Sequence, residues 1–292
     1  MENNEINLYY EEKGNSNEEM IIFLHSNLLS NWIWKNQRNS FENYHCIYLD
    51  LPNHGNSYYG LDFSIEKSAR IIKDLIKEKS NIGSKTKKVH LVGISVGGQI
   101  ILYLLAKYPE LIDTAIVTGV NIYEKPRKKF INEIIAMLDR LKLDILDKKS
   151  DKFLIKALLA EYGLEKQYYD DLKESTRQII NNNCVDDDYN HNLNNITKKS
   201  LEFKIPKIEY SENNSNDYSN LLILYGTKEY PKIQKSANLI KNSFKNAKIF
   251  SVYRSIHLWN VIDYEWFNEI VKDFIANKNL DLNEKPYLKR ED

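Results

Sequence analysis

The fold is decided by the run Val89-His90-Leu91-Val92-Gly93-Ile94-Ser95-Val96-Gly97-Gly98. Its apolar first part has the length of a buried strand, and residues 96–108 are predicted to form a helix that ends before Pro109. A serine in such a strand-to-helix turn is raised out of the backbone, and the helix N-terminus directs free N–H groups toward developing negative charge. The run therefore predicts Ser95 as a nucleophile; an idle serine in a glycine-rich turn is the alternative.

Short apolar runs alternate with helical segments along most of the chain. The predicted strands are residues 21–25, 44–50, 89–92, 114–118, 221–225 and 248–252, and the predicted core helices are 64–79, 96–108, 231–244 and 263–275. This alternation indicates an α/β fold with a mostly parallel, doubly wound sheet. The alternating segment 6–12 before Gly14 predicts a first strand that turns into a hairpin.

The alternation stops between residues 121 and 219, where the patterns are helical. The predicted helices of this block are 127–141, 151–162, 167–180 and 192–200. Because core strands resume after it, we predict a helical cap at 121–219, inserted into a core made of residues 1–120 and 220–280; a separate helical domain is the alternative. Residues 281–292 are charged and are predicted to be a disordered tail.

Composition excludes several classes of function. Of the 292 residues 42% are apolar, and 41 Lys and Arg balance 41 Asp and Glu, so no net charge attracts nucleic acid or an anionic membrane. Two cysteines, without metal-ligand spacing, indicate a reduced compartment and no metal site. Neither a signal peptide nor a membrane span is visible, so we expect a cytoplasmic protein with a small-molecule substrate. Composition does not predict its oligomeric state.

A serine nucleophile needs a base, and histidine suits this role near neutral pH. His257 follows the last predicted core strand, at the sheet edge where loops face Ser95. The other five histidines lie in or beside strands, in loops before the nucleophile or in the inserted block: His25, His45, His54, His90 and His191.

The histidine in turn needs a carboxylate that orients it. Glu229 follows the predicted strand 221–225, at the carboxyl end where active-site loops gather. Glu124, which follows the strand 114–118, is the alternative. Asp263 follows His257 too closely and is predicted to cap the last helix.

Backbone N–H groups would bind the oxyanion that forms when a serine attacks an acyl carbon. His25-Ser26-Asn27 closes an early apolar strand, and we predict that the N–H groups of Asn27 and Val96 play this part. Five apolar residues are candidates to line the substrate pocket: Trp32, Trp34, Tyr123, Leu258 and Trp259. Core packing is the expected role of at least half of the aromatic ones.

Together these motifs resemble the α/β-hydrolase superfamily, over about residues 6–276. The stretch 24–27 is similar to the family's His-Gly oxyanion loop, 50–57 to its Asp-x-x-Gly-x-Gly-x-Ser loop, and 93–98 to its nucleophile elbow. Ser26 and Asn53 depart from the pattern because each stands where the family usually has glycine.

The resemblance implies a serine hydrolase without metal or organic cofactor. The family's chain order of serine, acid and histidine selects His257 as the base, with Glu229 as the acid where aspartate is more common. The expected substrates are small to medium apolar esters, thioesters, lactones or related acyl compounds. An acyltransferase with the same three residues and a non-catalytic, receptor-like binder are the alternatives.

Overall fold

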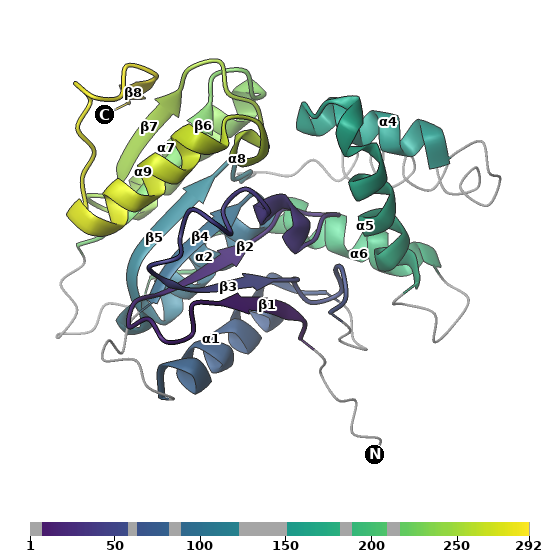
Figure 1. The fold of residues 1–292 in the computed structure, drawn as a ribbon, viewed down its shortest axis with the longest axis horizontal. Coiled ribbons are helices and arrows are strands. Elements are labelled where there is room, and N and C mark those ends of the chain that lie inside the picture. The colour runs from purple at the N-terminus through teal and green to yellow at the C-terminus, as the bar shows by residue number, and fades with distance from the viewer. Residues whose placement is uncertain are drawn as a thin grey trace.

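A computed structural model describes residues 8–57, 63–81, 89–122, 151–181, 189–208 and 217–291. An eight-stranded sheet runs through its centre in the order β1-β3-β2-β4-β5-β6-β7-β8 (Figure 1). The strands are β1 (Tyr10–Lys13), β2 (Met20–Leu24), β3 (His45–Leu49), β4 (Val89–Ile94), β5 (Ile112–Thr118), β6 (Leu221–Gly226), β7 (Lys248–Val252) and β8 (Leu288–Arg290).

The six central strands are parallel, and only the edge strands β1 and β8 are antiparallel to their neighbours. The predicted α/β class is therefore confirmed. The predicted hairpin is wrong, because β1 pairs with β3 rather than with the next strand, β2. Both sides of β2 are occupied by parallel strands, and its residues are buried throughout, whereas half-exposed β1 suits an edge.

Helices cover both faces of the sheet. They are α1 (Ile65–Asn81), α2 (Val96–Lys107), α7 (Pro231–Ser243), α8 (Trp259–Ile262) and α9 (Tyr264–Asn277), with the short 3-10 helices η1 (Asn31–Trp34) and η2 (Pro109–Leu111). Figure 1 shows α9 in front of the sheet and α2 behind it. The Ser64 hydroxyl accepts the Lys67 N–H at 3.4 Å, as an N-cap does. Asp263 stands at the N-cap of α9 as predicted, but its side chain makes no capping hydrogen bond and instead accepts from the Ser255 hydroxyl.

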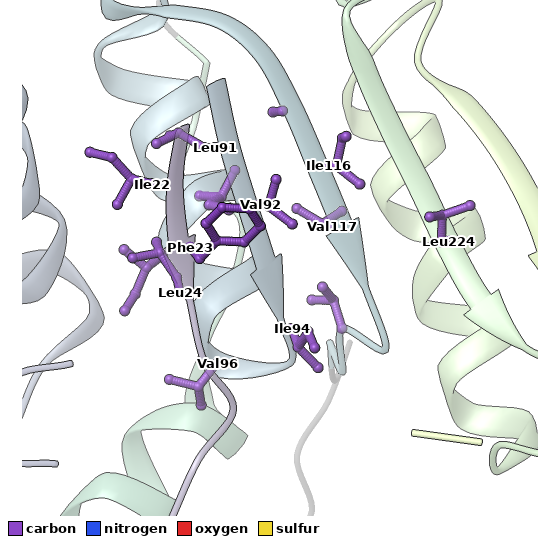
Figure 2. Packing of buried hydrophobic residues seen from close by; sticks show 14 of the residues in the cluster. Ile22, Phe23, Leu24, Leu91, Val92, Ile94, Val96, Ile116, Val117 and Leu224 are labelled. Carbon is purple, nitrogen blue, oxygen red and sulfur yellow. The ribbon is translucent and has the colours of Figure 1, made fainter. Parts of the chain in front are cut away.

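The core lies where the parallel strands meet these helices. Phe23, Val92 and Ile116 are register partners on β2, β4 and β5, and Figure 2 shows the buried side chains of this region. Cys46 on β3 belongs to the same core, and burial raises the pKa of its thiol to about 12. A thiol that stays protonated at neutral pH is typical of a structural cysteine.

The described part of the block between β5 and β6 is mostly helical. It contains α4 (Asp151–Tyr162), η3 (Lys166–Tyr168), α5 (Tyr169–Asn181) and α6 (Tyr189–Glu202), while the predicted helix 127–141 lies outside the described residues. Figure 1 shows α4, α5 and α6 grouped to one side of the sheet. The Trp32 indole N–H donates to the Ser175 hydroxyl of α5 at 2.7 Å, and the Gln99 amide of α2 donates to the Ser200 carbonyl of α6 at 3.0 Å. Both contacts join the block to loops and helix starts that follow parallel strands.

The C-terminal tail is ordered over residues 281–291, so the predicted disorder is wrong there. Residues Leu288–Arg290 form β8 on β7, and Tyr287 stacks on Trp266 at 4.3 Å between ring centroids. The Lys285 side chain is fully buried and pairs with Glu269 at 3.0 Å and with Asp273. These two carboxylates neutralise the charge of Lys285, so it can be buried. In the sequence alone, the charges of this segment indicated a solvated tail.

No helix among the described residues is long and apolar enough to cross a membrane.

Candidate active site

Ser95 lies in the tight turn between β4 and α2. Its backbone has φ 53° and ψ −113°, a conformation that costs a non-glycine residue about 1–3 kcal/mol. The Ser95 N–H donates to the Thr118 carbonyl at 2.9 Å, which ties the turn to the end of β5. A Cβ atom on Gly93 would lie 2.7 Å from the Gly97 carbonyl carbon, so position 93 requires a residue without a side chain. The side chain of Ser95 is half-buried at the N-terminus of α2.

The start of α2 also touches the loop that follows β2. The Gly97 N–H donates to the His25 carbonyl at 3.2 Å, and a Cβ atom on Gly97 would lie 2.2 Å from the Leu24 oxygen. This close approach brings the Asn27 loop beside the turn of Ser95. Within the described part of the chain, the backbone N–H groups of Asn27 and Val96 donate no hydrogen bond. Both groups are therefore available to an acceptor at this end of the sheet.

His257 and Glu229 follow β7 and β6 and are hydrogen-bonded to each other. The distance between His257 Nδ1 and Glu229 Oε1 is 2.6 Å. Glu229 Oε2 accepts the Gly226 N–H at 2.7 Å, which fixes the second carboxylate oxygen. The Glu229 side chain is 3% exposed and that of His257 is 17% exposed. The carboxylate is thus almost enclosed, while the imidazole keeps access to solvent.

A two-residue step, Thr118-Gly119, connects these two halves of the site. Thr118 accepts the Ser95 N–H, and its hydroxyl accepts the Trp259 indole N–H at 3.0 Å. Gly119 has φ 62°, and a Cβ atom there would lie 2.8 Å from both Cε1 and Nδ1 of His257. Thr118 contacts the Ser95 turn and Gly119 contacts the His257 ring. Ser95 and His257 therefore lie on either side of one short backbone segment.

The hydrogen bond to Glu229 determines what His257 can do. A carboxylate only accepts hydrogen bonds, so Nδ1 carries the proton that it donates to Glu229. In the neutral ring Nε2 then has a free lone pair, as a general base requires. Ser95, His257 and Glu229 therefore come from loops after β4, β7 and β6, at the carboxyl ends of parallel strands.

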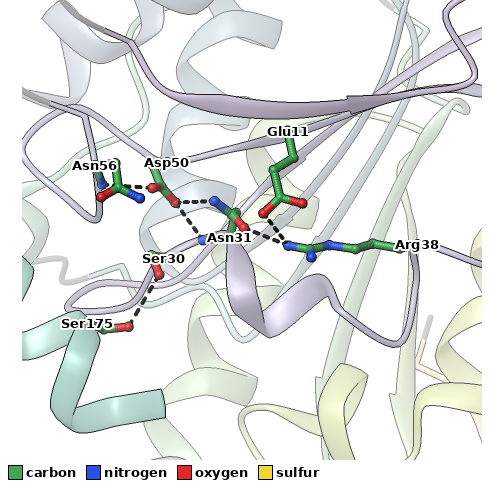
Figure 3. A network of polar contacts seen from close by, with 7 residues as sticks. All are labelled: Glu11, Ser30, Asn31, Arg38, Asp50, Asn56 and Ser175. Atoms are coloured by element: carbon green, nitrogen blue, oxygen red, sulfur yellow. Dashed lines mark hydrogen bonds and ion pairs between the residues drawn. The ribbon is translucent and has the colours of Figure 1, made fainter. Parts of the chain in front are cut away.

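A buried polar network holds the loop that carries Asn27 (Figure 3). Asp50, fully buried after β3, accepts the Asn31 backbone N–H at 2.7 Å and the Asn31 amide at 2.9 Å through Oδ1, and the Asn56 N–H at 2.9 Å through Oδ2. Arg38 donates to the Asn31 side-chain oxygen and pairs with Glu11. Burial raises the pKa of Asp50, while these hydrogen bonds oppose that shift. The network ties the loops after β2 and β3 together.

Two buried histidines support the same loop. His25 Nδ1 donates to the Ser26 carbonyl at 2.7 Å, and its Nε2 accepts the Leu51 N–H at 2.9 Å. His54 Nε2 lies 3.3 Å from Asn27 Oδ1. Burial lowers the pKa of His25 to about 4, and burial with the nearby charge of His25 lowers that of His54 to about 3. Both rings are therefore neutral and structural at neutral pH.

Comparison with known proteins gives the family. Residues 19–252 match the family model described as alpha/beta hydrolase fold. The chain belongs to the alpha/beta hydrolase family. The predicted superfamily and fold class are thereby confirmed, and members of this family are mostly hydrolases.

Individual relatives of this alpha/beta hydrolase are distant. An "AB hydrolase superfamily protein" of Gibberella zeae is 38% identical over 81 residues, which cover 28% of this chain and 27% of that protein. "Ethanol acetyltransferase 1" of Wickerhamomyces ciferrii is 26% identical over 126 residues, 40% of this chain and 31% of that protein. The match thus spans less than a third of either relative's length. A solved thermophilic esterase of Thermogutta terrifontis is similar in fold, with a TM-score of 0.67 and 13% identity over 94% of each chain.

The two departures from the family's glycine pattern have different backbone settings. Asn53 has φ 63°, in the left-handed region, where asparagine is among the few tolerated alternatives to glycine. Ser26 is buried and has no positive φ, so its side chain causes no backbone strain. The left-handed residue of the loop after β2 is instead Leu28, at φ 58°.

The pocket candidates divide into core residues and others. Trp34, Leu258 and Trp259 have no exposed surface, and Trp34 packs against Phe23, so these three belong to the core of the alpha/beta hydrolase rather than to a solvent-filled pocket. Trp32 is half-buried and bonds to Ser175. Tyr123, like the alternative acid Glu124, lies outside the described residues.

Sequence reasoning missed Tyr162 and Gly119. The Tyr162 hydroxyl donates to the Asn27 carbonyl at 2.6 Å, and its ring stacks on His257. The pair Tyr162-Gly163 at a predicted helix end indicates only a helix C-cap. It does not indicate the contacts of Tyr162, because Asn27 and His257 are far away in sequence. Gly119, directly after a predicted strand, signalled only a turn.

Among the described residues no group of three or more His, Cys, Asp or Glu side chains is arranged to hold a metal ion.

Proposed function

We propose that this alpha/beta hydrolase is a serine hydrolase that cleaves acyl bonds, with Ser95 as nucleophile, His257 as base and Glu229 as the orienting acid. The observation that carries the proposal is the 2.6 Å hydrogen bond between His257 Nδ1 and Glu229 Oε1, beside the strained turn of Ser95. A buried carboxylate that fixes the tautomer of an accessible imidazole is the arrangement that serine activation needs.

The acylation step follows from these positions. His257 Nε2 takes the Ser95 hydroxyl proton while Ser95 Oγ bonds to the substrate's carbonyl carbon, and the carbonyl π electrons move onto its oxygen. The backbone N–H groups of Asn27 and Val96 bind that oxyanion, assisted by the positive end of α2. When the intermediate collapses, the leaving oxygen takes the proton from His257 and an acyl-enzyme remains.

Deacylation repeats the chemistry with water. His257 Nε2 takes a proton from a water molecule while the water oxygen attacks the acyl carbon. When this second tetrahedral intermediate collapses, His257 returns the proton to Ser95 Oγ and the carboxylic acid is released. Glu229 stabilises the imidazolium in both steps without taking its proton. The mechanism uses no metal or organic cofactor.

We propose that the inserted block 121–219 is a cap that selects small to medium apolar acyl groups. Three contacts of its described helices support this role: Tyr162 with Asn27, Ser175 with Trp32, and the Ser200 carbonyl with Gln99. All three partners lie in loops or at a helix start near the carboxyl ends of strands. A substrate that reaches Ser95 would pass beside these helices.

Hydrolysis of p-nitrophenyl acetate and butyrate tests the proposal. We expect saturable release of p-nitrophenol by the wild type and a loss of roughly 10⁴-fold or more for Ser95→Ala. Equal rates for the two proteins would contradict the assignment.

Transfer of the acyl group to an alcohol is the second candidate. It is favoured by the partial match to ethanol acetyltransferases, which concerns 40% of this chain. The same acyl-enzyme serves both reactions, and only the acceptor differs. Incubation of p-nitrophenyl acetate with ethanol separates them, because ethyl acetate forms in transfer and acetate forms in hydrolysis.

A further inference from the structure

Tyr162, in the inserted block, contacts two proposed catalytic elements at once. It ends α4 and is 6% exposed. Its hydroxyl donates to the Asn27 carbonyl at 2.6 Å. Its ring stacks on the His257 imidazole, with 5.8 Å between centroids and 19° between planes.

We propose that Tyr162 is a positioning residue that aims the oxyanion loop through the Asn27 carbonyl and holds the ring of His257. The inference rests on the proposed function, since it concerns the same reaction. It assigns to the inserted helices a part in the chemistry itself, beyond that of covering a substrate.

The hydrogen bond acts on the residue whose N–H would bind the oxyanion. The Asn27 carbonyl and N–H belong to the two peptide planes that meet at the Asn27 Cα atom, so a hydrogen bond that holds the carbonyl restrains this Cα and with it the position of the N–H. The next residue, Leu28, has φ 58°, which a branched side chain rarely adopts and which would relax if nothing held it. Tyr162 holds the carbonyl of the peptide between Asn27 and Leu28.

The ring contact acts on the base. Glu229 fixes Nδ1 of His257 from one edge, and the Tyr162 ring covers one face of the imidazole. Swinging of His257 away from Ser95 would break both contacts. The close approach of α4 depends on Gly163, which has φ 67° and where a Cβ atom would lie 2.6 Å from Ile256 Cδ1.

A purely structural tyrosine would behave differently. If Tyr162 only attached α4 to the core, the loss of its hydroxyl would lower stability and leave kcat per folded enzyme unchanged. Tyr168 supplies the matched control, since it lies in the same block, is 8% exposed and stacks on Trp32. Its hydroxyl has no hydrogen-bond partner among the described residues.

The experiment compares Tyr162→Phe with Tyr168→Phe on p-nitrophenyl acetate and on the matching thionoester. We expect Tyr162→Phe to lower kcat on the ester by about 5- to 10-fold, with KM within twofold, as loss of one aligned hydrogen bond predicts. The loss of kcat on the thionoester should be smaller. Its sulfur accepts hydrogen bonds weakly, so the N–H donors of the oxyanion site stabilise its transition state less. Tyr168→Phe should match the wild type on both substrates.

Each other outcome overturns the assignment. Equal kcat for the two variants, or equal losses by Tyr162→Phe on both substrates, would show that its hydroxyl does not act through the oxyanion site. Labelling of Ser95 by a fluorophosphonate, measured in parallel, separates this failure from a failure of the proposed function. A wild type that labels and hydrolyses leaves the function standing, whereas one that does neither overturns both.

Discussion

Glu229 Oε1 lies 2.6 Å from Nδ1 of His257, and the other oxygen of that carboxylate accepts the Gly226 N–H at 2.7 Å. Both carboxylate oxygens are therefore engaged, and the imidazole is left with one orientation in which its hydrogen bond is satisfied. Because Glu229 follows β6 and His257 follows β7, the pair is held by neighbouring parallel strands. Their relationship fixes Nε2 as the atom that would meet Ser95.

Glu229→Gln should leave the fold intact and remove most activity. The amide keeps the shape of the side chain but loses the charge that stabilises the imidazolium, and it can stabilise the wrong tautomer. We expect kcat on p-nitrophenyl acetate to fall roughly 10³- to 10⁴-fold. The control is Glu265→Gln, an exposed glutamate on α9, which should keep full activity. Wild-type kcat in Glu229→Gln would remove this residue from the mechanism.

Gly119→Ala should damage the site as well as the fold. A Cβ atom there would lie 2.8 Å from the His257 ring and 3.0 Å from Glu229 Oε1, at φ 62°. We expect roughly 10- to 100-fold lower kcat from displacement of the base. Gly14→Ala is the matched control, because its φ of 63° and its close contact with the Tyr44 carbonyl give similar backbone strain. It should lose stability but keep kcat; equal kcat losses in both variants would refute the local explanation.

Asp50→Asn should destabilise the protein through the network of Figure 3. An amide nitrogen in place of one oxygen would face either the Asn31 donors or the Asn56 N–H, leaving buried donors without an acceptor. We expect a loss of about 2–3 kcal/mol in the free energy of unfolding, measured with urea. Asp74→Asn, with a 70% exposed side chain, should change it by less than about 0.5 kcal/mol. Similar small changes in both would show that the network contributes little.

The buried histidines should make stability depend on pH. Burial lowers the pKa of His25 to about 4 and of His54 to about 3, below the ordinary value of 6.5 that the unfolded chain regains. As pH falls from 7 to 5 the unfolded state binds protons that the folded state does not. Each histidine should therefore remove about 2 kcal/mol of stability. Urea unfolding of the wild type and of His54→Gln at both pH values checks this, since the variant should lose less; equal losses would contradict the prediction.

The main fold was predictable because its signals are local. Contiguous residues indicate most of the fold: apolar runs indicate the strands, and the glycines around Ser95 indicate the turn after β4. The family model confirms the fold class. Edge strands were harder, because β1 pairs with β3 instead of with its neighbour in sequence. The tail was mispredicted since the partners of Lys285 lie on α9, where no local pattern indicates them.

The candidate site was predictable to the extent that residue type and strand ends define it. Glu229 and His257 each follow a strand, and the structure brings them into hydrogen-bond contact. The contact of Tyr162 with Asn27 joins residues 135 positions apart, and no local pattern encodes it. The pocket candidates Trp34, Leu258 and Trp259 lie in the core instead, because large apolar side chains fill a core as readily as they line a pocket.

The most direct test of the account is covalent labelling of the nucleophile. Wild type and Ser95→Ala are incubated with a fluorophosphonate at neutral pH, and the modified peptide is identified by mass spectrometry. We predict one adduct per chain, on Ser95, and no adduct in the variant. An unlabelled wild type, or equal labelling of both proteins at another residue, would contradict the assignment of Ser95 as nucleophile.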